Sequence, residues 1–505
     1  MMSNTLKYCQ IVSNAHRKSV GQFFTNERVA QFMVEWVLCS DVKELYDPAF
    51  GLGAFRPNDP SIVFSASEID KRVIKFYHEN SCPDISFLAN EDYLSSWGKR
   101  HANIVCNPPY MRFQKFLNRD SVFQDFKEQL NLTLSGYTNT ASAFLLKSLS
   151  ELDGRGRLSY IMPLEFLNTG YGTLVKQKLL EKGHLIGIIS LECEKEIFPD
   201  ATTSVGILLY DCKVKSPEVE FYSIKSINEL AHFKSKSPVS TINVNNLNPK
   251  DKWLPYLKQL SISFDLDRKM TVALEYYGRF SRGIATGANE FFVLSKSKAM
   301  SLGLYPRECT PCITRSSQIT RPVISDKDIA DFLELEKPVL LFSANGLSSK
   351  AAKEYIRKGE SLGYHERFLT KHRTPWYKTE ARTPAPLLLG VFSRGGYKII
   401  RNKSNALNLT CYHGFHPNLF GLGYIDHLFL YLLSQTGRKI ISLSMRSYGD
   451  SLDKFEPNDL NTASVPSRDF FDSFTSEEII SGMQYVGDFG VLPEKLELKF
   501  KTLMK

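Results

Sequence analysis

The residues best suited to chemistry in this chain are Asn107, Pro108, Pro109 and Tyr110. An apolar run at Ile104–Cys106 predicts a short buried strand that ends at this turn. The two prolines fix the backbone and remove two N–H donors, so the Asn107 amide oxygen and the Pro108 carbonyl can both accept from one planar amino group. Tyr110 adds a ring on which a planar group can stack. The turn predicts a holder for an exocyclic NH2 group, with an ordinary strand-to-loop turn as the alternative.

A glycine-containing loop, Asp47–Phe55, follows the first predicted strand. In an open α/β sheet, ligands bind beyond the carboxyl ends of the strands. Gly51 and Gly53 let the backbone approach a ligand that any Cβ would push away. Because no third glycine opens a helix, the loop departs from the dinucleotide-binding pattern.

Acidic residues follow the next two predicted strands. Glu68 stands twenty-one residues after Asp47 and can accept from both hydroxyls of a ribose. Asp92 and Tyr93 follow the third strand and could bind an adenine amino group and cover its ring face. Taken singly, each acid is more often a surface carboxylate. Placed in order after three strands of one sheet, they describe a site for an adenosine.

The elements that must position these residues alternate short apolar strands with helical patterns over about the first 215 residues. Thr25 or Asn26 can cap a helix whose apolar residues recur at the helical period. The expected strands are Glu44–Tyr46, Ile62–Ala66, Ile85–Leu88, Ile104–Cys106, Leu158–Met162, Leu185–Leu191 and Val205–Asp211. The expected helices between them include Lys71–Tyr77, Ala141–Leu152 and Thr173–Lys182. The pattern predicts an α/β fold: a seven-stranded, mostly parallel sheet with helices on both faces.

The composition is that of a soluble globular protein with two to four domains: 505 residues, 43% of them hydrophobic and 23% charged. No apolar run is long enough to span a membrane, and the first residues lack the hydrophobic core of a signal peptide. Nine cysteines in no disulfide pattern favour a reducing cytoplasm. No set of residues has the spacing of a metal site.

The charge is unevenly distributed along the chain. Residues 1–225 hold 25 Lys and Arg against 26 Asp and Glu, whereas residues 226–505 hold 38 against 28. The basic half favours a polyanionic partner, with nucleic acid ahead of a membrane surface because no basic amphipathic helix is evident. Solvated surface lysines are the alternative. The polar stretch from about Val214 to Leu254 is interpreted as the region between domains.

In motif order, the chain resembles the gamma-class N6-adenine DNA methyltransferases of type II restriction–modification systems, the TaqI-like family. Gly21–Thr25 resembles the motif that closes the S-adenosylmethionine pocket in this class, although Asn26 stands where the family commonly has proline. Asp47–Phe55 is similar to the cofactor loop, and Asn107–Tyr110 falls on the catalytic motif. Gly156–Pro163 resembles the fifth-strand segment. Any one motif is weak evidence, but the ordered set is strong.

The resemblance implies roles for individual residues. Those expected at the cofactor are Thr25, Asp47, Pro48, Ala49, Gly51, Gly53, Glu68, Ile69, Asp92 and Tyr93. Phe198 matches the aromatic residue that packs on the extruded base. Gly283–Phe292 and Tyr448–Pro457 resemble segments of the recognition domains. From the basic half we add Arg279, Arg282, Arg446 and Lys454 as phosphate or base-edge contacts.

The sequence is therefore expected to encode a catalytic domain at 1–225 and a mixed α+β target-recognition domain at 226–505. The expected reaction moves a methyl group from S-adenosylmethionine to adenine N6 in duplex DNA, with the base flipped out and no metal. A separate restriction endonuclease is the expected functional partner, and a monomer in the prokaryotic cytoplasm is favoured. The alternatives are methylation of a protein glutamine or an RNA base, and a DNA-specificity subunit that needs a partner for activity.

Overall fold

The computed structural model describes residues 4–13, 16–17, 21–39, 42–81, 84–111, 118–197, 204–257, 270–344, 349–393, 396–448 and 452–504. The chain forms two compact units. One comprises Met1–Ser263 with Ser447–Asp450, and the other comprises Phe264–Arg446 with Ser451–Lys505. Within the described residues, no helix combines the length and the apolar character needed to cross a membrane.

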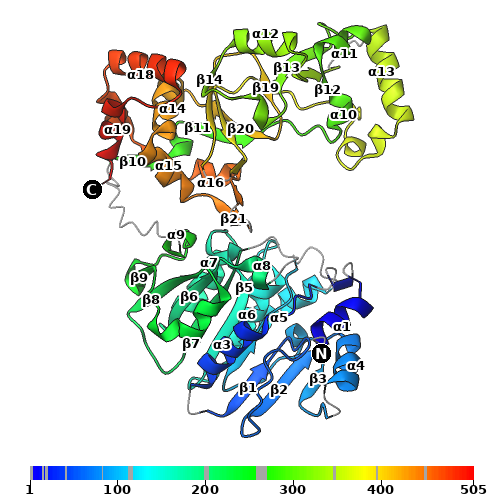
Figure 1. Cartoon of the computed structure of the whole chain (residues 1–505), viewed down its shortest axis with the longest axis vertical. Helices are drawn as coiled ribbons and strands as arrows, with labels where there is room; N and C mark the ends of the chain where they lie inside the picture. Colours follow the sequence, from blue (N-terminus) through cyan, green and yellow to red (C-terminus); the bar gives the residue numbers. More distant parts are fainter. Residues whose placement is uncertain are drawn as a thin grey trace. The chain divides into compact units, whose positions relative to one another are not determined.

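The first unit is built on a nine-stranded sheet in the order β3-β2-β1-β4-β5-β7-β6-β8-β9 (Figure 1). Its strands are β1 Glu44–Asp47, β2 Val63–Glu68, β3 Leu88–Asn90, β4 Ile104–Cys106, β5 Arg157–Pro163, β6 Leu185–Leu191, β7 Val205–Asp211, β8 Glu218–Ile224 and β9 Ser240–Asn243. The first five strands pair in parallel, and β7 runs antiparallel between β5 and β6. A strand lies at or next to each of the seven predicted positions, with β3 shifted toward the C-terminus. The expected count of seven strands was too low.

The two additional strands lie in the stretch interpreted from composition as inter-domain. β8 pairs in parallel with β6, and β9 pairs antiparallel with β8. Val219, Phe221 and Ile224 are buried, because apolar residues recur in β8 despite the polar composition around them. The predicted domain boundary at 225 was therefore wrong, and the first unit continues to Ser263.

Helices cover both faces of this sheet. They are α1 Asn4–Ile11, α3 Glu27–Leu38, α4 Lys71–Asn80, α5 Arg119–Leu130, α6 Thr140–Glu151, α7 Gly172–Leu180, α8 Glu194–Ile197 and α9 Leu254–Leu257. The side chain of Asn26 caps α3 by accepting from the Arg28 amide, and the apolar stripe of that helix is buried, as predicted. The strand residues alternate between the faces. Ile104 and Cys106 belong to the core under α5, α6 and α7, whereas Val105 belongs to the core under α3.

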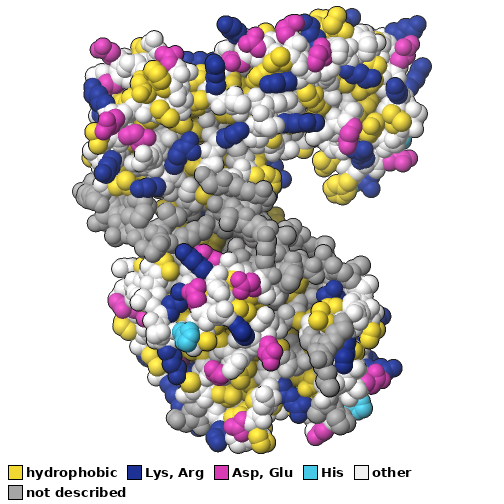
Figure 2. All heavy atoms as spheres, viewed as in Figure 1, with side chains coloured by type: hydrophobic (Ala, Val, Ile, Leu, Met, Phe, Trp, Pro, Cys, Tyr) yellow, Lys and Arg dark blue, Asp and Glu magenta, His cyan; other side chains and the backbone are white. Residues whose placement is uncertain are grey.

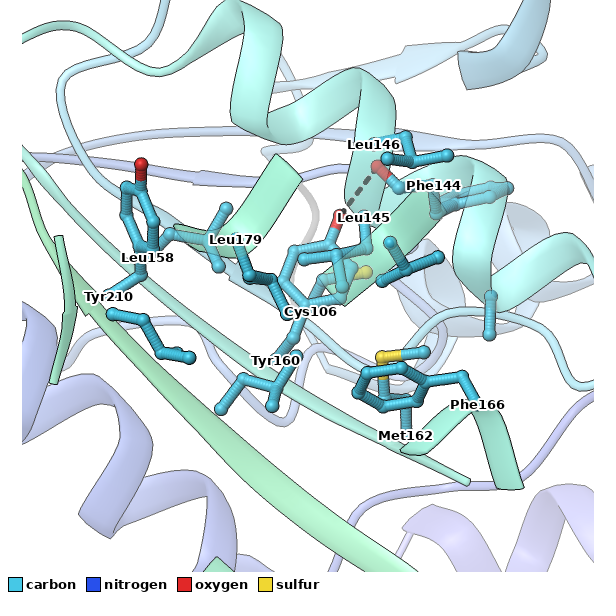
Figure 3. Close-up of a cluster of buried hydrophobic side chains, with 14 of the residues drawn as sticks. Cys106, Phe144, Leu145, Leu146, Leu158, Tyr160, Met162, Phe166, Leu179 and Tyr210 are labelled. Atoms are coloured by element: carbon cyan, nitrogen blue, oxygen red, sulfur yellow. Dashed lines mark hydrogen bonds between the residues drawn. The ribbon is translucent and has the colours of Figure 1, made fainter. Parts of the chain in front are cut away.

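Figure 3 shows the larger of these two cores. Cys106 of β4 lies beside Tyr160 and Met162 of β5, and α6 contributes Phe144, Leu145 and Leu146. The Tyr160 hydroxyl donates to the Phe144 carbonyl at 3.4 Å, so the buried phenol has a partner. This core supports the strand from which the Asn107 turn emerges.

The second unit is mixed α+β, as expected. Its larger sheet has the order β11-β20-β16-β18-β14, and a second sheet has the order β12-β15-β13-β19. The strands are β10 Thr271–Ala273, β11 Gly278–Arg282, β12 Val293–Leu294, β13 Cys309–Ile313, β14 Val323–Ile324, β15 Leu340–Phe342, β16 Leu387–Gly390, β17 Phe392–Ser393, β18 Ile399–Asn402, β19 Leu407–Asn408, β20 Tyr412–Pro417, β22 Leu452–Lys454 and β23 Ser464–Pro466. Strand β21, Arg446–Tyr448, divides between the units: Arg446 belongs to the second, and Ser447 and Tyr448 belong to the first.

The helices of this unit gather mainly at its C-terminal end. They are α10 Asn289–Phe292, α11 Lys296–Ser301, α12 Asp326–Glu334, α13 Lys350–Ser361, α14 Ile425–Leu433, α15 Gln435–Ser442, α16 Pro457–Asn461, α17 Arg468–Asp472, α18 Ser476–Phe489 and α19 Glu494–Lys501. Helices α14, α15, α18 and α19 share one core with β11 and β16. Helix α13 lies at the opposite end of the unit from α18 (Figure 1).

Candidate active site at the carboxyl edge of the sheet

Three turns leave the first sheet at the same edge. Strand β1 ends at Asp47, β2 ends at Glu68 and β4 ends at Cys106. The strands are parallel neighbours: Asp47 lies opposite Ala66, and Tyr46 lies opposite Ile104. The edge at which these carboxyl ends meet is where open α/β sheets bind ligands.

Asn107 is held by its amide nitrogen. Nδ2 donates to the Phe23 carbonyl at 2.8 Å and to Thr25 Oγ1 at 2.9 Å. A carbonyl only accepts, so the nitrogen must face Phe23, and this fixes which way the amide points. Within the described residues Oδ1 is buried with no hydrogen-bond partner. Such an atom costs about 1–3 kcal/mol, and an amino group is the kind of ligand that would remove this cost.

The segment Gly21–Thr25 packs against the Asn107 turn. Gly21 has φ of +69°, and a Cβ on it would lie 2.9 Å from the Tyr110 amide nitrogen. That nitrogen donates to the Gly21 carbonyl at 3.3 Å. The Phe23 ring stacks on the Tyr110 ring with centroids 5.5 Å apart. A side chain at position 21 would separate the two segments, so the positive φ and the close approach both require glycine.

Tyr110 is fixed at both ends of its side chain. Its ring lies against Phe23, and its hydroxyl donates to the Ile161 carbonyl at 3.0 Å. The chain just after it is held by Thr140, whose hydroxyl accepts from the Met111 amide at 3.0 Å and donates to the Pro109 carbonyl. Sequence reasoning missed Thr140, because a threonine at the start of a predicted helix carries no signal for a role in a distant turn.

Two carboxyl groups are buried beside these turns. Asp47 is fully buried; Oδ1 accepts from the Ala49 amide at 3.0 Å, and Oδ2 has no partner among the described residues. Burial, with a smaller contribution from the nearby Glu68 charge, raises the pKa of Asp47 to about 8. Burial also raises the pKa of Glu68 to about 7, although its oxygens accept from the Gly51 and Asp70 amides at 2.8 Å each. Both groups would ionise more readily if a cation or several donors were bound beside them.

The glycine loop has the conformation that its sequence predicts. Gly51 and Gly53 have φ of +56° and +78°, and a Cβ on Gly53 would meet the Phe50 and Tyr77 rings at 2.9 Å. The loop is tied to the second strand because the Phe50 amide donates to the Ser67 carbonyl. Pro48 is buried and Ala49 half-buried between these contacts.

The third predicted turn is used differently from the expectation. Asp92 caps a short 3-10 helix: its oxygens accept from the Leu94 amide at 3.0 Å and from the Ser95 hydroxyl at 3.2 Å. Tyr93 is 2% exposed, and its hydroxyl donates to Glu151 at 2.8 Å inside the core. The prediction that Tyr93 covers a ligand ring was wrong, because its ring fills the space under α6. Ile69, in contrast, is 60% exposed at the end of β2.

Most of the predicted DNA contacts are engaged with acids. Arg282 bonds to Glu456 at 2.8 Å, and Lys454 bonds to the same carboxylate. Burial alone would raise the pKa of Glu456, but these two cations outweigh it and hold the pKa at about 2. Arg279 pairs with Glu275 at 3.1 Å, and both are exposed. Phe198 and the side chain of Arg446 lie outside the described residues.

Comparison with known proteins follows the same division of the chain. Residues 49–198 match the family model of the Eco57I restriction-modification methylase, and residues 251–482 match that of the C-terminal domain of the type II methyltransferase M.Eco57I. The chain is 36% identical to the type II methyltransferase M.AccI of Acinetobacter calcoaceticus, over 94% of this chain and 90% of the relative. It is 22% identical to M.XamI of Xanthomonas campestris pv. amaranthicola, over 88% of this chain and 85% of that one.

Solved structures show the same architecture at low sequence identity. The type IIL restriction-modification enzyme MmeI, solved in complex with DNA, aligns with a TM-score of 0.55 at 13% identity, over 97% of this chain and 72% of its own. The DrdV–DNA complex aligns with a TM-score of 0.50 at 12% identity, over 89% of this chain and 57% of its own. At such identities the likeness concerns the fold alone.

Proposed function

The chain belongs to the type II methyltransferases of restriction–modification systems, and from this premise we propose that it methylates adenine N6 within a specific duplex sequence, with S-adenosylmethionine as the methyl donor. The gamma-class assignment is part of this proposal. So are the roles of the two units: catalysis in the first, and recognition of the DNA target in the second.

One observation carries the choice of an amino group as the acceptor of the methyl. Asn107 Oδ1 is a buried acceptor without a partner among the described residues, held in place by the two bonds of Nδ2. An exocyclic amino group donates two hydrogens, which the Asn107 oxygen and the Pro108 carbonyl could accept together. Both acceptors would stabilise the positive charge that develops on the nitrogen as it is alkylated.

The buried acids fit the proposed cofactor. S-adenosylmethionine supplies an electrophilic methyl group on a sulfonium. Asp47 Oδ2 is a buried carboxyl oxygen without a partner among the described residues, beside a loop that has no Cβ at Gly51 and Gly53. Glu68 accepts from two backbone amides and retains lone pairs for hydroxyl donors such as those of a ribose. The Thr25 hydroxyl accepts from Asn107 and keeps its own hydrogen to donate, so Thr25 is also proposed to contact the cofactor.

The proposed reaction needs positioning more than a base. The carbon–sulfur bond breaks as the carbon–nitrogen bond forms, and one N6 proton then leaves to water. The reacting atoms must be held in line at about 3–3.5 Å. The nearest histidine in sequence is His101, which stacks on Tyr46 before β4 begins, at the other end of that strand. Burial lowers the pKa of His101 to about 4, so it is a poor base.

DNA recognition completes the proposal. A base paired in a duplex must be flipped out before its amino group reaches Asn107. Phe23 stacks on the Tyr110 ring and holds it at the turn. Packing of the flipped base against Tyr110 is proposed to contribute roughly 1–3 kcal/mol. Phe198 is proposed to pack on the same base. A separate restriction endonuclease is the proposed functional partner, and the protein is proposed to act as a cytoplasmic monomer.

The proposal is tested by incubating the protein with S-adenosylmethionine labelled in its methyl group and a mixture of duplexes. We expect label in N6-methyladenine within one sequence context, found by digestion and mass spectrometry of nucleosides. Label in N4-methylcytosine, in RNA or in protein would refute the N6 assignment. Binding of DNA without transfer would support a specificity subunit instead.

A further inference from the structure

A short basic and aromatic turn projects from the second unit beyond α13. It comprises residues 363–373 and contains two 3-10 helices, Tyr364–Glu366 and Thr370–His372. Phe368 is 75% exposed, and Lys371 and His372 beside it are also exposed. Residues 350–382, which include this turn, hold nine Lys and Arg against four Asp and Glu. Figure 2 shows Lys, Arg and hydrophobic side chains interleaved at the end of the unit that carries α13.

Hydrogen bonds hold the turn in place next to its exposed tip. Thr370 is fully buried, and its hydroxyl donates to the Arg367 carbonyl at 3.1 Å. Arg373 donates from Nη1 to the Thr286 carbonyl at 2.9 Å and from Nη2 to the Ala285 carbonyl. These bonds join the turn to a segment some eighty residues earlier in the chain.

That segment belongs to Gly283–Phe292, the motif whose sequence resembles a segment of recognition domains. Gly287 has φ of +79°, and a Cβ on it would lie 2.8 Å from the Leu369 Cβ. Glu290 bonds to Arg367 at 2.9 Å. The Phe291 ring stacks on Tyr355 of α13 with centroids 4.6 Å apart. The motif therefore packs against the turn and α13 and fixes the position of the turn.

The tip of the turn has side chains that the fold does not use. Its neighbour Leu369 packs against Gly287, but most of the Phe368 ring faces solvent, touching His372 with centroids 5.2 Å apart. Arg367 bonds to Glu290, whereas none of the described ion pairs involves Lys371. An exposed aromatic ring beside a lysine that makes no ion pair among the described residues is a combination by which proteins bind nucleic acid.

We propose that the turn at residues 363–373 is a DNA-contacting element of the second unit. Lys371 neutralises a backbone phosphate, and Phe368 packs against a nucleotide next to it. The proposal rests on the proposed function, since it takes duplex DNA as the substrate, and it adds a contact site distinct from Arg279, Arg282 and Lys454. A polyanion is favoured over a protein partner because the charge of the segment is strongly positive.

The test compares Phe368→Ala and Lys371→Ala with matched controls at the other end of the same unit. Phe489 of α18 is 66% exposed, and Lys501 of α19 is exposed, so Phe489→Ala and Lys501→Ala remove the same groups elsewhere. The Kd for an unmethylated duplex that carries the sequence methylated by the protein is measured by fluorescence anisotropy at several salt concentrations. Thermal unfolding and binding of a cofactor analogue are measured alongside.

Phe368→Ala is expected to weaken DNA binding about tenfold. Lys371→Ala is expected to weaken it and to lower the slope of log Kd against log salt by about one. Both variants should keep wild-type unfolding and cofactor binding, and both controls should bind DNA within about twofold of wild type. Wild-type DNA affinity in both variants would overturn the inference. Failure of the wild-type protein to methylate DNA would instead refute the proposed function.

Discussion

Two buried asparagines at opposite ends of β4 provide a matched test of the active site. Asn107 Nδ2 donates to two protein oxygens, and its Oδ1 has no partner among the described residues. Asn103 Nδ2 donates to the Val42 and Glu44 carbonyls, and its Oδ1 accepts from the Arg157 amide at 2.9 Å. The two side chains differ at the amide oxygen: that of Asn103 accepts a hydrogen bond, and that of Asn107 accepts none from the described residues.

The effects of replacing each asparagine with alanine follow from these bonds. Asn103→Ala loses at least these three hydrogen bonds, each worth about 1 kcal/mol, so the free energy of unfolding should fall by at least about 3 kcal/mol. Asn107→Ala loses two such bonds but also removes an unpaired buried oxygen that costs about 1–3 kcal/mol. Its free energy of unfolding should therefore stay within about 1 kcal/mol of wild type.

Activity should change in the opposite order. Removing one preorganised group that stabilises developing charge lowers kcat by about 10²–10³-fold, and Asn107→Ala should show at least this loss at saturating cofactor. Asn103→Ala, assayed where it is fully folded, should transfer the methyl group at close to the wild-type rate. Urea unfolding and single-turnover transfer give the two quantities. A Asn107→Ala variant that loses about 3 kcal/mol of stability, or one that keeps wild-type transfer, would refute the reasoning.

Three further predictions concern the surrounding groups. Because burial raises the pKa of Asp47 to about 8 and of Glu68 to about 7, the folded free protein holds protons that the unfolded chain releases. Stability should therefore fall as the pH rises from about 5 to 8. A cofactor analogue should bind more tightly at pH 8 than at pH 6, with proton release measurable by calorimetry in two buffers and diminished in Asp47→Asn. Gly21→Ala should lower kcat at least tenfold by displacing the turn on which it packs. Gly183→Ala is the control, because Gly183 also has a positive φ, +71°, but an added Cβ would have nothing within 4 Å. Unchanged methyl transfer in both variants would contradict the importance of the contact between Gly21 and the turn. Tyr93→Phe should lower the free energy of unfolding by about 1–3 kcal/mol and leave the cofactor KM unchanged; a raised KM would restore its role as a ligand.

The errors in the sequence-based prediction have identifiable physical causes. The polar stretch after Val214 was interpreted as the region between domains. A strand needs apolar residues only at the positions that face a core, and β8 has them at Val219, Phe221 and Ile224. Tyr93 was assigned to a ligand because an aromatic after a strand end can face either way. The chain turns into a 3-10 helix at Asp92, and that turn directs the ring into the core.

The sequence was sufficient to predict the α/β fold, the positions of strands β1 to β7 and the Asn107 turn. Those features depend on local patterns: apolar periodicity, prolines that fix φ and glycines that permit positive φ. The family resemblance led us to expect Gly21–Thr25 at the cofactor pocket, and the structure adds its hydrogen bonds to the Asn107 turn.

Only the tertiary structure decided which atoms are occupied and which are open. Phe23 and Thr25 orient the Asn107 amide from more than eighty residues away, and Thr140 holds the chain after Tyr110. Arg282 and Lys454, chosen from the sequence as DNA contacts, share one carboxylate, whereas the turn carrying Phe368 went unnoticed. Residue types and their order are local properties of a chain. Hydrogen-bond partners and exposure are set when segments distant in the sequence pack together. The proposed chemistry depends on acceptor atoms, such as Asn107 Oδ1, that this packing leaves without a partner among the described residues.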